Sequence, residues 1–321
     1  MIGKSSKIQK VIDLIAKISL YDAPVLIEGE TGTGKEVVAR SIHYGGIRHN
    51  KPFIPVNCGA IPDNLFESQL FGHFKGAFTD AKQDHPGMVG LAGEGSIFLD
   101  EIDSLSAKGQ VTLLRFLQDN CYRPVGGNCE IQSNVRVIAA SNADLLNRVE
   151  RGDFRRDLFY RLNVLYLALP PLRERQGDIK LLAEHFIRHY AGKLDRPLKT
   201  FHPETLAWFN RYSWPGNVRE LENLVYREFL LCEGPVITID PLGSQIEERR
   251  SLPDRRCYCR NGLSFNIAKD MALKEFEHRY LVSLLSDTHG NVTSAAKLSG
   301  KERRCLGKLI KKHQIDINLF R

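Results

Sequence analysis

The sequence has no apolar run that approaches the length needed to cross a membrane, which excludes a transmembrane helix from these 321 residues. Its start also lacks the unbroken apolar core of a signal peptide. The first apolar residues instead recur at helical intervals among lysines, at Ile8, Val11, Ile12, Ile15 and Ile18. A hydrophobic content of 42% fits a soluble globular protein, and the chain is too long for one compact core. We therefore expect two or three domains.

The cysteines show no spacing pattern that would indicate a disulfide framework. The seven cysteines stand singly apart from Cys257 and Cys259, so we expect reduced thiols and a cytoplasmic location. This Cys-x-Cys pair has no second pair at zinc-ligand spacing, and we expect no metal there.

Acidic residues are scarce towards the C-terminus. From Arg249 to the end, 16 lysines and arginines stand against 7 aspartates and glutamates, a net charge of +9 that leaves −2 for residues 1–248. Such segregation is typical of a nucleic-acid-binding appendage on a near-neutral body, and a solvated basic tail is the alternative.

Residues 29–36, the phosphate loop, read Gly-Glu-Thr-Gly-Thr-Gly-Lys-Glu. The apolar run from Pro24 to Ile27 predicts a buried strand before the loop, and helical spacing follows it. Glycines between a strand and a helix bring backbone N–H groups against phosphate oxygens, and Lys35 would reach the β- and γ-phosphates. We therefore favour nucleotide binding over a plain glycine-rich turn. The contacts are expected from Gly29, Glu30, Thr31, Gly32, Thr33, Gly34, Lys35 and Glu36.

Further apolar segments alternate with helical patterns and predict an α/β fold with a parallel sheet, whose ligand site lies at the C-terminal ends of the strands. These predicted strands are Phe53 to Val56, Ser96 to Leu99, Val135 to Ala140 and Val164 to Leu169. After two prolines at 170 and 171, helical spacing from Ile179 to Cys232 predicts a small helical lid.

Two carboxylates follow the predicted strand at Ser96 to Leu99. Asp100 would hold Mg²⁺ through water, and Glu101 would polarise the water that attacks ATP. Mg²⁺ must be held here because Glu36 occupies the place of the usual Ser or Thr after the lysine. The alternative is a pair of acidic residues that merely begins a loop. Since Lys35, Asp100 and Glu101 are expected at the ends of adjacent strands, we predict Mg²⁺-dependent ATP hydrolysis.

The stretch from Glu67 to Ala81 places glycines beside aromatic residues. Gly72 and Gly76 interrupt a helix expected to begin near Leu65, and Phe74 and Phe78 lie in the exposed part. This pattern is consistent with a mobile loop whose tip binds a partner, or with an aromatic-anchored crossover helix.

The basic C-terminal segment ends in two short helical patterns, Thr293 to Leu298 and Lys301 to Lys312, separated by a turn at Ser299 and Gly300. Helix, turn and basic helix at this spacing predict a helix-turn-helix, although Gly307 is a poor helix former and a simple helical hairpin is the alternative.

Three signatures occur in order: GETGTGKE at 29–36, the segment Gly87 to Ile102 that ends in SIFLDEI, and WPGNVREL at 214–221. With them the chain resembles, over nearly its whole length, the AAA+ activators of sigma-54 RNA polymerase, the bacterial enhancer-binding proteins. The resemblance implies an AAA+ α/β ATPase core at 1–171, a helical lid at 172–240, a basic linker at 241–262 and an all-α Fis-type helix-turn-helix domain at 263–321.

The resemblance also implies roles for single residues. Asn57 matches the residue that hydrogen-bonds the catalytic glutamate, and Asn142 matches sensor I. Arg155 and Arg161 match the arginine fingers that complete a neighbouring subunit's site, so hydrolysis would require a ring, which the resemblance implies is a hexamer. Arg219 matches sensor II, which reaches the nucleotide from the lid.

At residues 76–81 the family reads GAFTGA and grips the sigma factor with this loop, whereas this chain reads GAFTDA. Phe78 and Thr79 are kept, and Asp80 adds a charge and narrows backbone freedom. One hypothesis is therefore a DNA-bound regulator that remodels sigma-54 holoenzyme by ATP hydrolysis. The other is an AAA+ DNA-binding regulator that no longer engages sigma-54.

The segment Gly290 to Leu298 resembles the start of the Fis-type domain. In the helix after it, Arg303, Arg304 and Lys308 would face the DNA groove, with Lys311 and Lys312 near phosphates. No receiver or ligand-sensing domain is expected before Met1, because Ile2 to Ser5 resembles the family's entry to the adenine pocket. The sequence names neither the target genes nor the signal.

Overall fold

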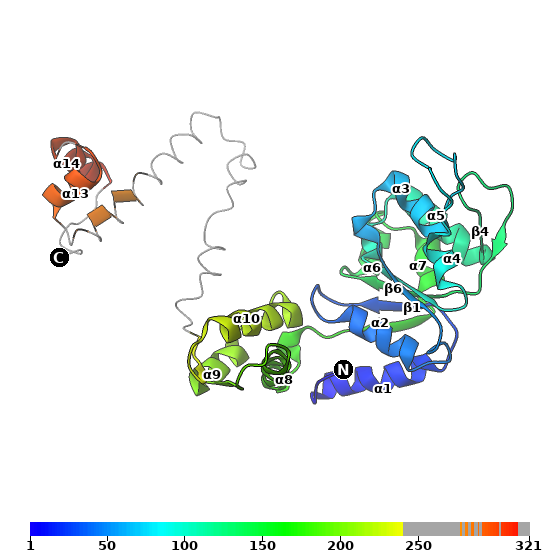
Figure 1. The fold of residues 1–321 in the computed structure, drawn as a ribbon, viewed down its shortest axis with the longest axis horizontal. Coiled ribbons are helices and arrows are strands. Elements are labelled where there is room, and N and C mark those ends of the chain that lie inside the picture. Colours follow the sequence, from blue (N-terminus) through cyan, green and yellow to red (C-terminus); the bar gives the residue numbers. More distant parts are fainter. Residues whose placement is uncertain are drawn as a thin grey trace. The chain divides into compact units, whose positions relative to one another are not determined.

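The computed structural model describes residues 1–239, 291–301 and 303–313, together with positions 277, 280, 281, 284, 285 and 288. The predicted linker at 241–262, including Cys257 and Cys259, lies outside the described residues. The chain divides into two compact units, Met1–Pro241 and Leu242–Arg321, and each is described by itself (Figure 1).

The first unit begins with alternating helices and strands, as the sequence predicts. They are α1 (Ser6–Ser19), β1 (Val25–Glu28), α2 (Lys35–Tyr44), β2 (Phe53–Asn57), α3 (Asp63–Phe71), α4 (Gly87–Ala92), β3 (Ser96–Asp100), α5 (Ala107–Asp119), β4 (Cys121–Tyr122), β5 (Ile131–Gln132), β6 (Arg136–Ser141), α6 (Leu145–Glu150), α7 (Arg156–Leu162) and β7 (Leu165–Ala168). The short β4–β5 pair was not predicted.

Five parallel strands form the central sheet in the order β2-β3-β6-β1-β7. The expectation that the phosphate loop and the acidic pair lie at the ends of adjacent strands is therefore wrong. β6 lies between β1 and β3, because the crossover connections place strands that are distant in the sequence next to each other. As a result, Asn142, which follows β6, lies between Lys35 and Asp100.

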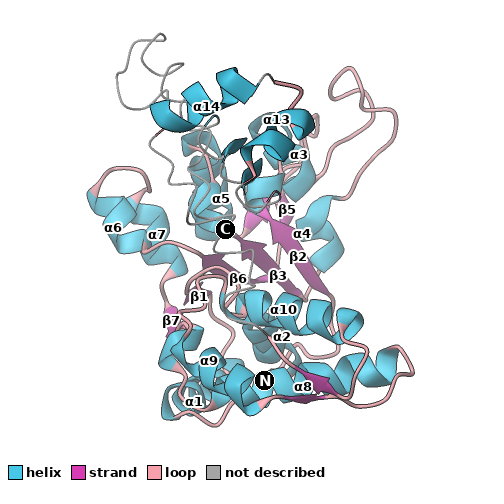
Figure 2. Ribbon diagram, turned by 90° about the vertical axis from the view of Figure 1, so that its left-hand side faces the viewer, coloured by secondary structure: helices cyan, strands magenta, loops and turns pink. Residues whose placement is uncertain are grey.

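Helices cover both faces of this sheet (Figure 2). Alternate strand residues point to opposite faces, so Leu26, Leu99 and Ala139 pack on the side of α3, α4, α5, α6 and α7. Their neighbours Ile27, Phe98 and Ile138 pack against α1 and α2. Both apolar clusters are buried and hold the C-terminal strand ends in fixed positions at one edge.

The lid follows β7 with η3 (Leu172–Glu174), α8 (Asp178–Lys193), β8 (Thr200–Phe201), α9 (Pro203–Arg211), α10 (Asn217–Leu231) and β9 (Val236–Ile237). Pro203 starts α9 at the position where a missing N–H costs nothing. The lid has its own apolar cluster, centred on Phe209, Trp214 and Phe229. Its small parallel pair β8–β9 was not predicted.

In the second unit, the structure describes α13 (Val292–Leu298) and α14 (Arg303–Lys312). The Asn291 side chain caps α13 by accepting from the N–H groups of Thr293 and Ser294. Leu306 and Ile310 of α14 pack with Ala295 and Leu285 in a separate small core. No helix within the described part of the chain is long and apolar enough to cross a membrane.

Candidate nucleotide site

The phosphate loop connects β1 to α2, and α2 begins at Lys35. Gly32 and Gly34 have φ angles of 79° and 100°, in the left-handed region that favours glycine. The Thr33 hydroxyl donates to the Glu30 carbonyl at 2.7 Å and closes the loop on itself. The N-terminus of α2 therefore points its free N–H groups at the space where phosphates would lie.

Lys35 is 6% exposed and lies at the centre of the site. Its ammonium group donates to the Gly29 carbonyl at 2.7 Å, to the Glu30 carbonyl at 3.1 Å and to Asn142 Oδ1 at 2.6 Å. Burial lowers the pKa of Lys35, and the negative charge of Asp100 opposes that shift. The structure thus brings Lys35 and the expected sensor I asparagine into direct contact.

Asp100 and Glu101 leave the C-terminal end of β3 beside this lysine. Asp100 Oδ1 accepts from the Glu101 N–H at 2.9 Å. Glu101 has a φ of 54°, which is uncommon for a residue other than glycine. The Ser104 N–H and hydroxyl both donate to the Glu101 carbonyl, at 2.9 and 2.6 Å, and hold this conformation. Residues held in this way often lie at functional sites.

Burial raises the pKa of Asp100, so its ionised form costs folding free energy in the absence of a cation. We expect Asp100→Asn to raise Tm at neutral pH by about 2 °C, the scale of a change somewhat below 1 kcal/mol in a domain of this size. The gain should shrink as the pH falls through the raised pKa of Asp100 and vanish below the ordinary aspartate pKa of 3.8, where the carboxyl is protonated in both the folded and the unfolded state. Thermal melts at several pH values test this, and a lower Tm at pH 7 would contradict it.

The donors present fit Mg²⁺, which takes few protein carboxylates and keeps water and phosphate ligands. Asp100 would hold the ion from the sheet side. Glu36 is not placed to help, because its carboxylate accepts from both Arg40 Nε and a terminal Arg40 nitrogen, at 2.9 and 2.8 Å, on the surface of α2. No cluster of three or more His, Cys, Asp or Glu side chains able to hold a metal by itself occurs among the residues the structure describes.

The lid lies directly on the phosphate loop. The N–H groups of Val218 and Arg219, at the start of α10, donate to the Gly32 carbonyl at 3.0 and 3.3 Å. A Cβ on Gly32 would lie 2.3 Å from the Gly216 carbonyl oxygen, so only glycine permits this approach. Arg219 therefore starts next to the loop, and its charge also acts on Lys35.

The polar contacts that join the loop to the lid were not predicted from the sequence. Arg173 makes a two-pronged ion pair with Glu30, at 2.8 and 2.6 Å. The buried Asn217 donates to Glu30 Oε2 at 3.1 Å and accepts from the Leu172 N–H at 2.8 Å. Arg175 is 3% exposed and donates to the Thr33 carbonyl at 3.1 Å. The motifs PPLRER and WPGNVRE contain these residues, but no local pattern reveals their partners.

Asn57 and Glu101 both lie against Gly59. An added Cβ there would be 2.7 Å from Glu101 Oε2 and 3.4 Å from Asn57 Oδ1. In this structure Asn57 Oδ1 accepts from the Ala60 N–H at 3.1 Å. The predicted contact between Asn57 and the catalytic glutamate remains a prediction.

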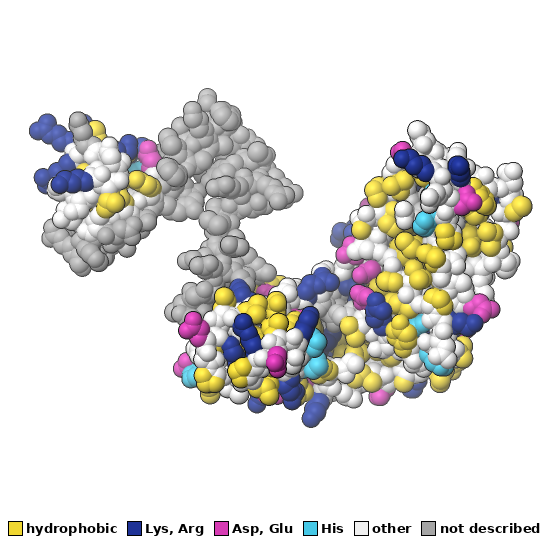
Figure 3. Space-filling view, in the orientation of Figure 1, with side chains coloured by type: hydrophobic (Ala, Val, Ile, Leu, Met, Phe, Trp, Pro, Cys, Tyr) yellow, Lys and Arg dark blue, Asp and Glu magenta, His cyan; other side chains and the backbone are white. Residues whose placement is uncertain are grey.

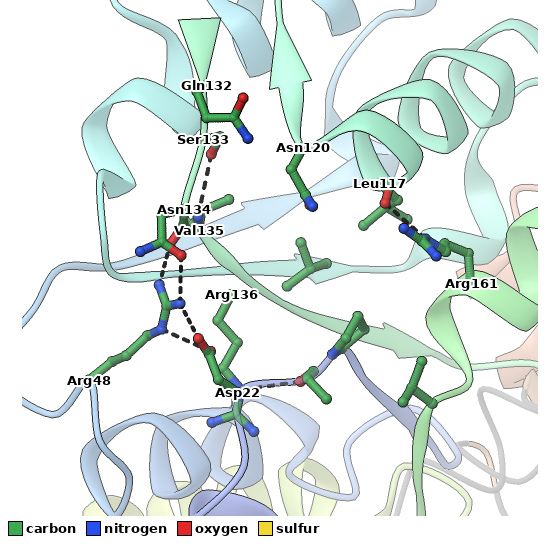
Figure 4. Close-up of a pocket in the computed structure, with 14 residues that line it drawn as sticks. Asp22, Arg48, Leu117, Asn120, Gln132, Ser133, Asn134, Val135, Arg136 and Arg161 are labelled. Atoms are coloured by element: carbon green, nitrogen blue, oxygen red, sulfur yellow. Dashed lines mark hydrogen bonds and ion pairs between the residues drawn. The ribbon is translucent and has the colours of Figure 1, made fainter.

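The two expected arginine fingers occupy different surroundings, away from the phosphate loop. Arg155 is exposed and pairs with Asp157 at 2.7 Å. Arg161 Nε donates to the Leu117 carbonyl at 2.8 Å, at the end of α5 (Figure 4). It lines a cavity of about 590 Å³ together with Asp22, Arg48 and Arg136. Neither arginine reaches the phosphate loop of its own subunit, as action on a neighbour would require.

The loop after α3 extends to an exposed tip that carries Phe78, Thr79 and Asp80. His73 and His85 pair through their backbones at its base, and the His73 ring contacts Phe78 with ring centroids 4.9 Å apart. Asp80 has no left-handed φ, so the replaced glycine is not required by the conformation seen here. The alternative of an aromatic-anchored crossover helix does not fit the structure, because α3 ends at Phe71.

On α14 the basic residues occupy the solvent side. Arg303, Arg304, Lys308 and Lys311 are exposed, opposite the buried Leu306 and Ile310. Figure 3 shows Lys and Arg side chains gathered on the described part of this unit. Lys312 differs, because it pairs with Glu277 at 2.9 Å. The helix continues through Gly307, and a turn at Ser299 and Gly300 precedes it.

A parallel sheet, a phosphate loop opposite two carboxylates and a helical lid on that loop together define a P-loop ATPase of the AAA+ class. The chain belongs to the sigma-54 activator family. The family model described as the sigma-54 interaction domain matches residues 1–168, and that of the AAA+ ATPase lid domain matches residues 173–256.

Curated relatives agree with this assignment. The regulatory protein AtoC of Escherichia coli is 42% identical over 308 residues, which cover 94% of this chain and 65% of AtoC. The DNA-binding transcriptional regulator NtrC of Azospirillum brasilense is 41% identical over 342 residues, covering the whole chain and 70% of that protein. The chain therefore spans about two thirds of the length of such relatives.

Solved structures show the same architecture. NtrX from Brucella abortus superimposes with a TM-score of 0.76 at 30% identity, over 98% of this chain and 69% of NtrX. NtrX has also been crystallised in complexes with ATP and with ADP.

Proposed function

We propose that this chain is a sigma-54-dependent transcriptional regulator that couples Mg²⁺-dependent ATP hydrolysis to remodelling of sigma-54 RNA polymerase holoenzyme while bound to duplex DNA. The observation that carries the proposal is the convergence of Lys35, Asn142, Asp100 and Glu101 at one sheet edge under the lid. Lys35 is buried with all its donors directed into the site, ready to exchange carbonyl oxygens for phosphate oxygens. ATP binding is further supported by the nucleotide complexes of NtrX.

The active form is a ring, a hexamer as in the family, because both candidate fingers lie away from their own phosphate loop. Arg155 or Arg161 would stabilise the charge on the γ-phosphate of the next subunit. Asp100 would hold Mg²⁺, and Arg219 would reach the nucleotide from the lid. Since all these parts are present, the proposal requires no catalytic group from another protein.

The partner contact is the exposed tip of the loop. We expect the ring trapped with ADP and aluminium fluoride to bind sigma-54, and Thr79→Ala to abolish transcriptional activation while ATP turnover persists. Asp80→Gly should tighten sigma-54 binding about fivefold, near 1 kcal/mol, because it removes a charge and restores backbone freedom. Native gel shifts measure sigma-54 binding, ATPase assays measure turnover, and transcription from a sigma-54 promoter in vitro measures activation.

Gln83→Ala is the matched control, because Gln83 is exposed on the same loop beyond the tip. If neither the native ring nor Asp80→Gly binds sigma-54 while ATPase activity is intact, the chain is a DNA-bound regulator without a sigma partner. No observation on the present structure favours that alternative.

The exposed basic face of α14 is the proposed DNA reader. Affinity for duplex DNA should fall steeply with salt because bound phosphates release counterions, and Lys311→Ala should reduce the slope of log K against log salt by about 1. Lys312→Ala should reduce it less, since Glu277 already pairs with Lys312. Arg303→Ala or Arg304→Ala should instead alter sequence preference. Salt-insensitive binding of the full chain in fluorescence anisotropy would refute this assignment.

A further inference from the structure

A buried glutamine holds the backbone of Arg155. Gln110 of α5 is 3% exposed, and both ends of its amide are used. Its nitrogen donates to the carbonyls of Leu105 and Asp153 at 3.0 and 3.2 Å. Its oxygen accepts from the Arg155 N–H at 2.9 Å. A primary amide is the side chain that can donate and accept in this way at one buried point.

The segment that Gln110 grips is also held from α6. The N–H groups of Asp153 and Phe154 donate to the Arg148 carbonyl at 2.9 and 3.3 Å. Phe154 is buried in the core beneath them. The backbone at Arg155 is therefore fixed from two helices, whereas the Arg155 guanidinium is exposed and hydrogen-bonds to the surface residue Asp157. This is the arrangement of a charged group presented to something outside the subunit.

The same elements lead back to the nucleotide site. The Arg148 guanidinium donates to the Asp103 carbonyl and lies 3.8 Å from Asp103 Oδ2. The side chain of Asp103 is 12% exposed, and its Oδ1 accepts from the Ser141 hydroxyl at 3.1 Å and from the Asn142 N–H at 3.2 Å. Asn142 in turn accepts from Lys35. Polar contacts and the residue Arg148 thus connect Lys35 to Arg155, because Arg148 holds Asp103 with its guanidinium and the backbone of Asp153 and Phe154 with its carbonyl.

We propose that Gln110 is the positioning residue for Arg155, and that Arg148 and Asp103 tie it to Asn142 so that a subunit's own site governs the arginine offered to its neighbour. This inference rests on the proposed function, in which Arg155 acts across a subunit boundary. The proposal predicts different effects on accepting an arginine finger and on supplying one. A subunit without Gln110 should still accept a finger and hydrolyse its own ATP, but it should fail to supply one.

Complementation in mixed rings tests this direction. Gln110→Met keeps the side-chain length and removes the polar contacts. Mixed with Lys35→Ala, which keeps an intact finger, it should raise ATP turnover at least about tenfold above either variant alone, given what a finger contributes. Mixed with Arg155→Ala, it should give no rescue, because neither subunit presents a finger. A purely structural defect would not distinguish the two mixtures.

Three controls separate the possible failures. Arg155→Ala mixed with Lys35→Ala must show rescue, and if it does not, the proposed function fails rather than the role of Gln110. Lys108→Met, at an exposed position on α5, should behave as the native chain. A Tm equal to that of the native chain, and ATP binding measured by calorimetry, establish that Gln110→Met is folded. If Gln110→Met does not fold, the test is the hydrogen-exchange rate of the Arg155 amide in Arg148→Met, a variant that keeps the contacts of the Arg148 carbonyl.

The proposed link through Arg148 is tested separately. In Arg148→Met, ATP binding should no longer change the exchange rate of the Arg155 amide, whereas in the native ring it should change it measurably. Rescue of Gln110→Met by Arg155→Ala would overturn the positioning role. An ATP-dependent change at Arg155 that survives in Arg148→Met would overturn the link to Asn142.

Discussion

Replacing Glu101 by glutamine is expected to leave ATP bound and to reduce its turnover by a factor of about 10² to 10⁴, the usual contribution of a general base. The carboxylate follows β3 in a left-handed conformation that its contacts with Ser104 maintain. An amide keeps the size and the neighbouring contacts but cannot polarise water in the same way. Calorimetry with ATP and a phosphate-release assay measure the two quantities separately.

Glu94→Gln is the matched control, because Glu94 is an exposed carboxylate that pairs with Lys51 at 2.6 Å on the surface. It should leave turnover within about twofold of the native value, since surface ion pairs contribute little. Undiminished turnover in Glu101→Gln would remove the glutamate from its catalytic role. Loss of ATP binding would instead indicate a disturbed site, because Glu101 N–H also supports Asp100.

The parts of the site that were predictable from the sequence are those formed by neighbours along the chain. The phosphate loop between β1 and α2, and the carboxylates that end β3, follow from apolar runs and glycines within about ten residues. The strand order was not predictable in this way. The position of β6 between β1 and β3 depends on the packing of whole layers, and it brings Asn142 to Lys35 across 107 residues.

The contacts between loop and lid escaped prediction for a similar reason. Glu30 contacts Arg173 and Asn217 across 143 and 187 residues of sequence, and Asn217 makes its contact from a left-handed backbone conformation with a φ of 53°. Single charged residues in a sequence are more often solvated than paired, so spacing alone could not identify these partners. The two arginine fingers show what resemblance alone cannot distinguish. Resemblance marks both Arg155 and Arg161, but only the structure separates their surroundings.

Removal of either finger should reduce ATP turnover, by about 10³ for a residue that stabilises the transferred phosphoryl group, but only one removal should affect folding. Arg161→Ala deletes the donors to the Leu117 and Gln118 carbonyls at the end of α5. We expect its Tm to fall by about 3 °C, the equivalent of about 1 kcal/mol in a domain of this size. Arg155→Ala should leave Tm unchanged, because the pair that it breaks with Asp157 is exposed.

Mixtures with Lys35→Ala then assign the function. A finger variant retains an intact phosphate loop, and Lys35→Ala retains both arginines. An active site therefore forms wherever a Lys35→Ala subunit lies beside a finger variant and supplies its arginine to the ATP bound there. Rescue of Arg155→Ala alone would identify Arg155 as the group that acts in trans and leave Arg161 as a support for α5. Rescue of both would require Arg161 to exchange its carbonyl contacts for the neighbour's phosphate when the ring assembles. If co-assembled rings show no rescue for either variant, hydrolysis does not depend on an arginine shared between subunits.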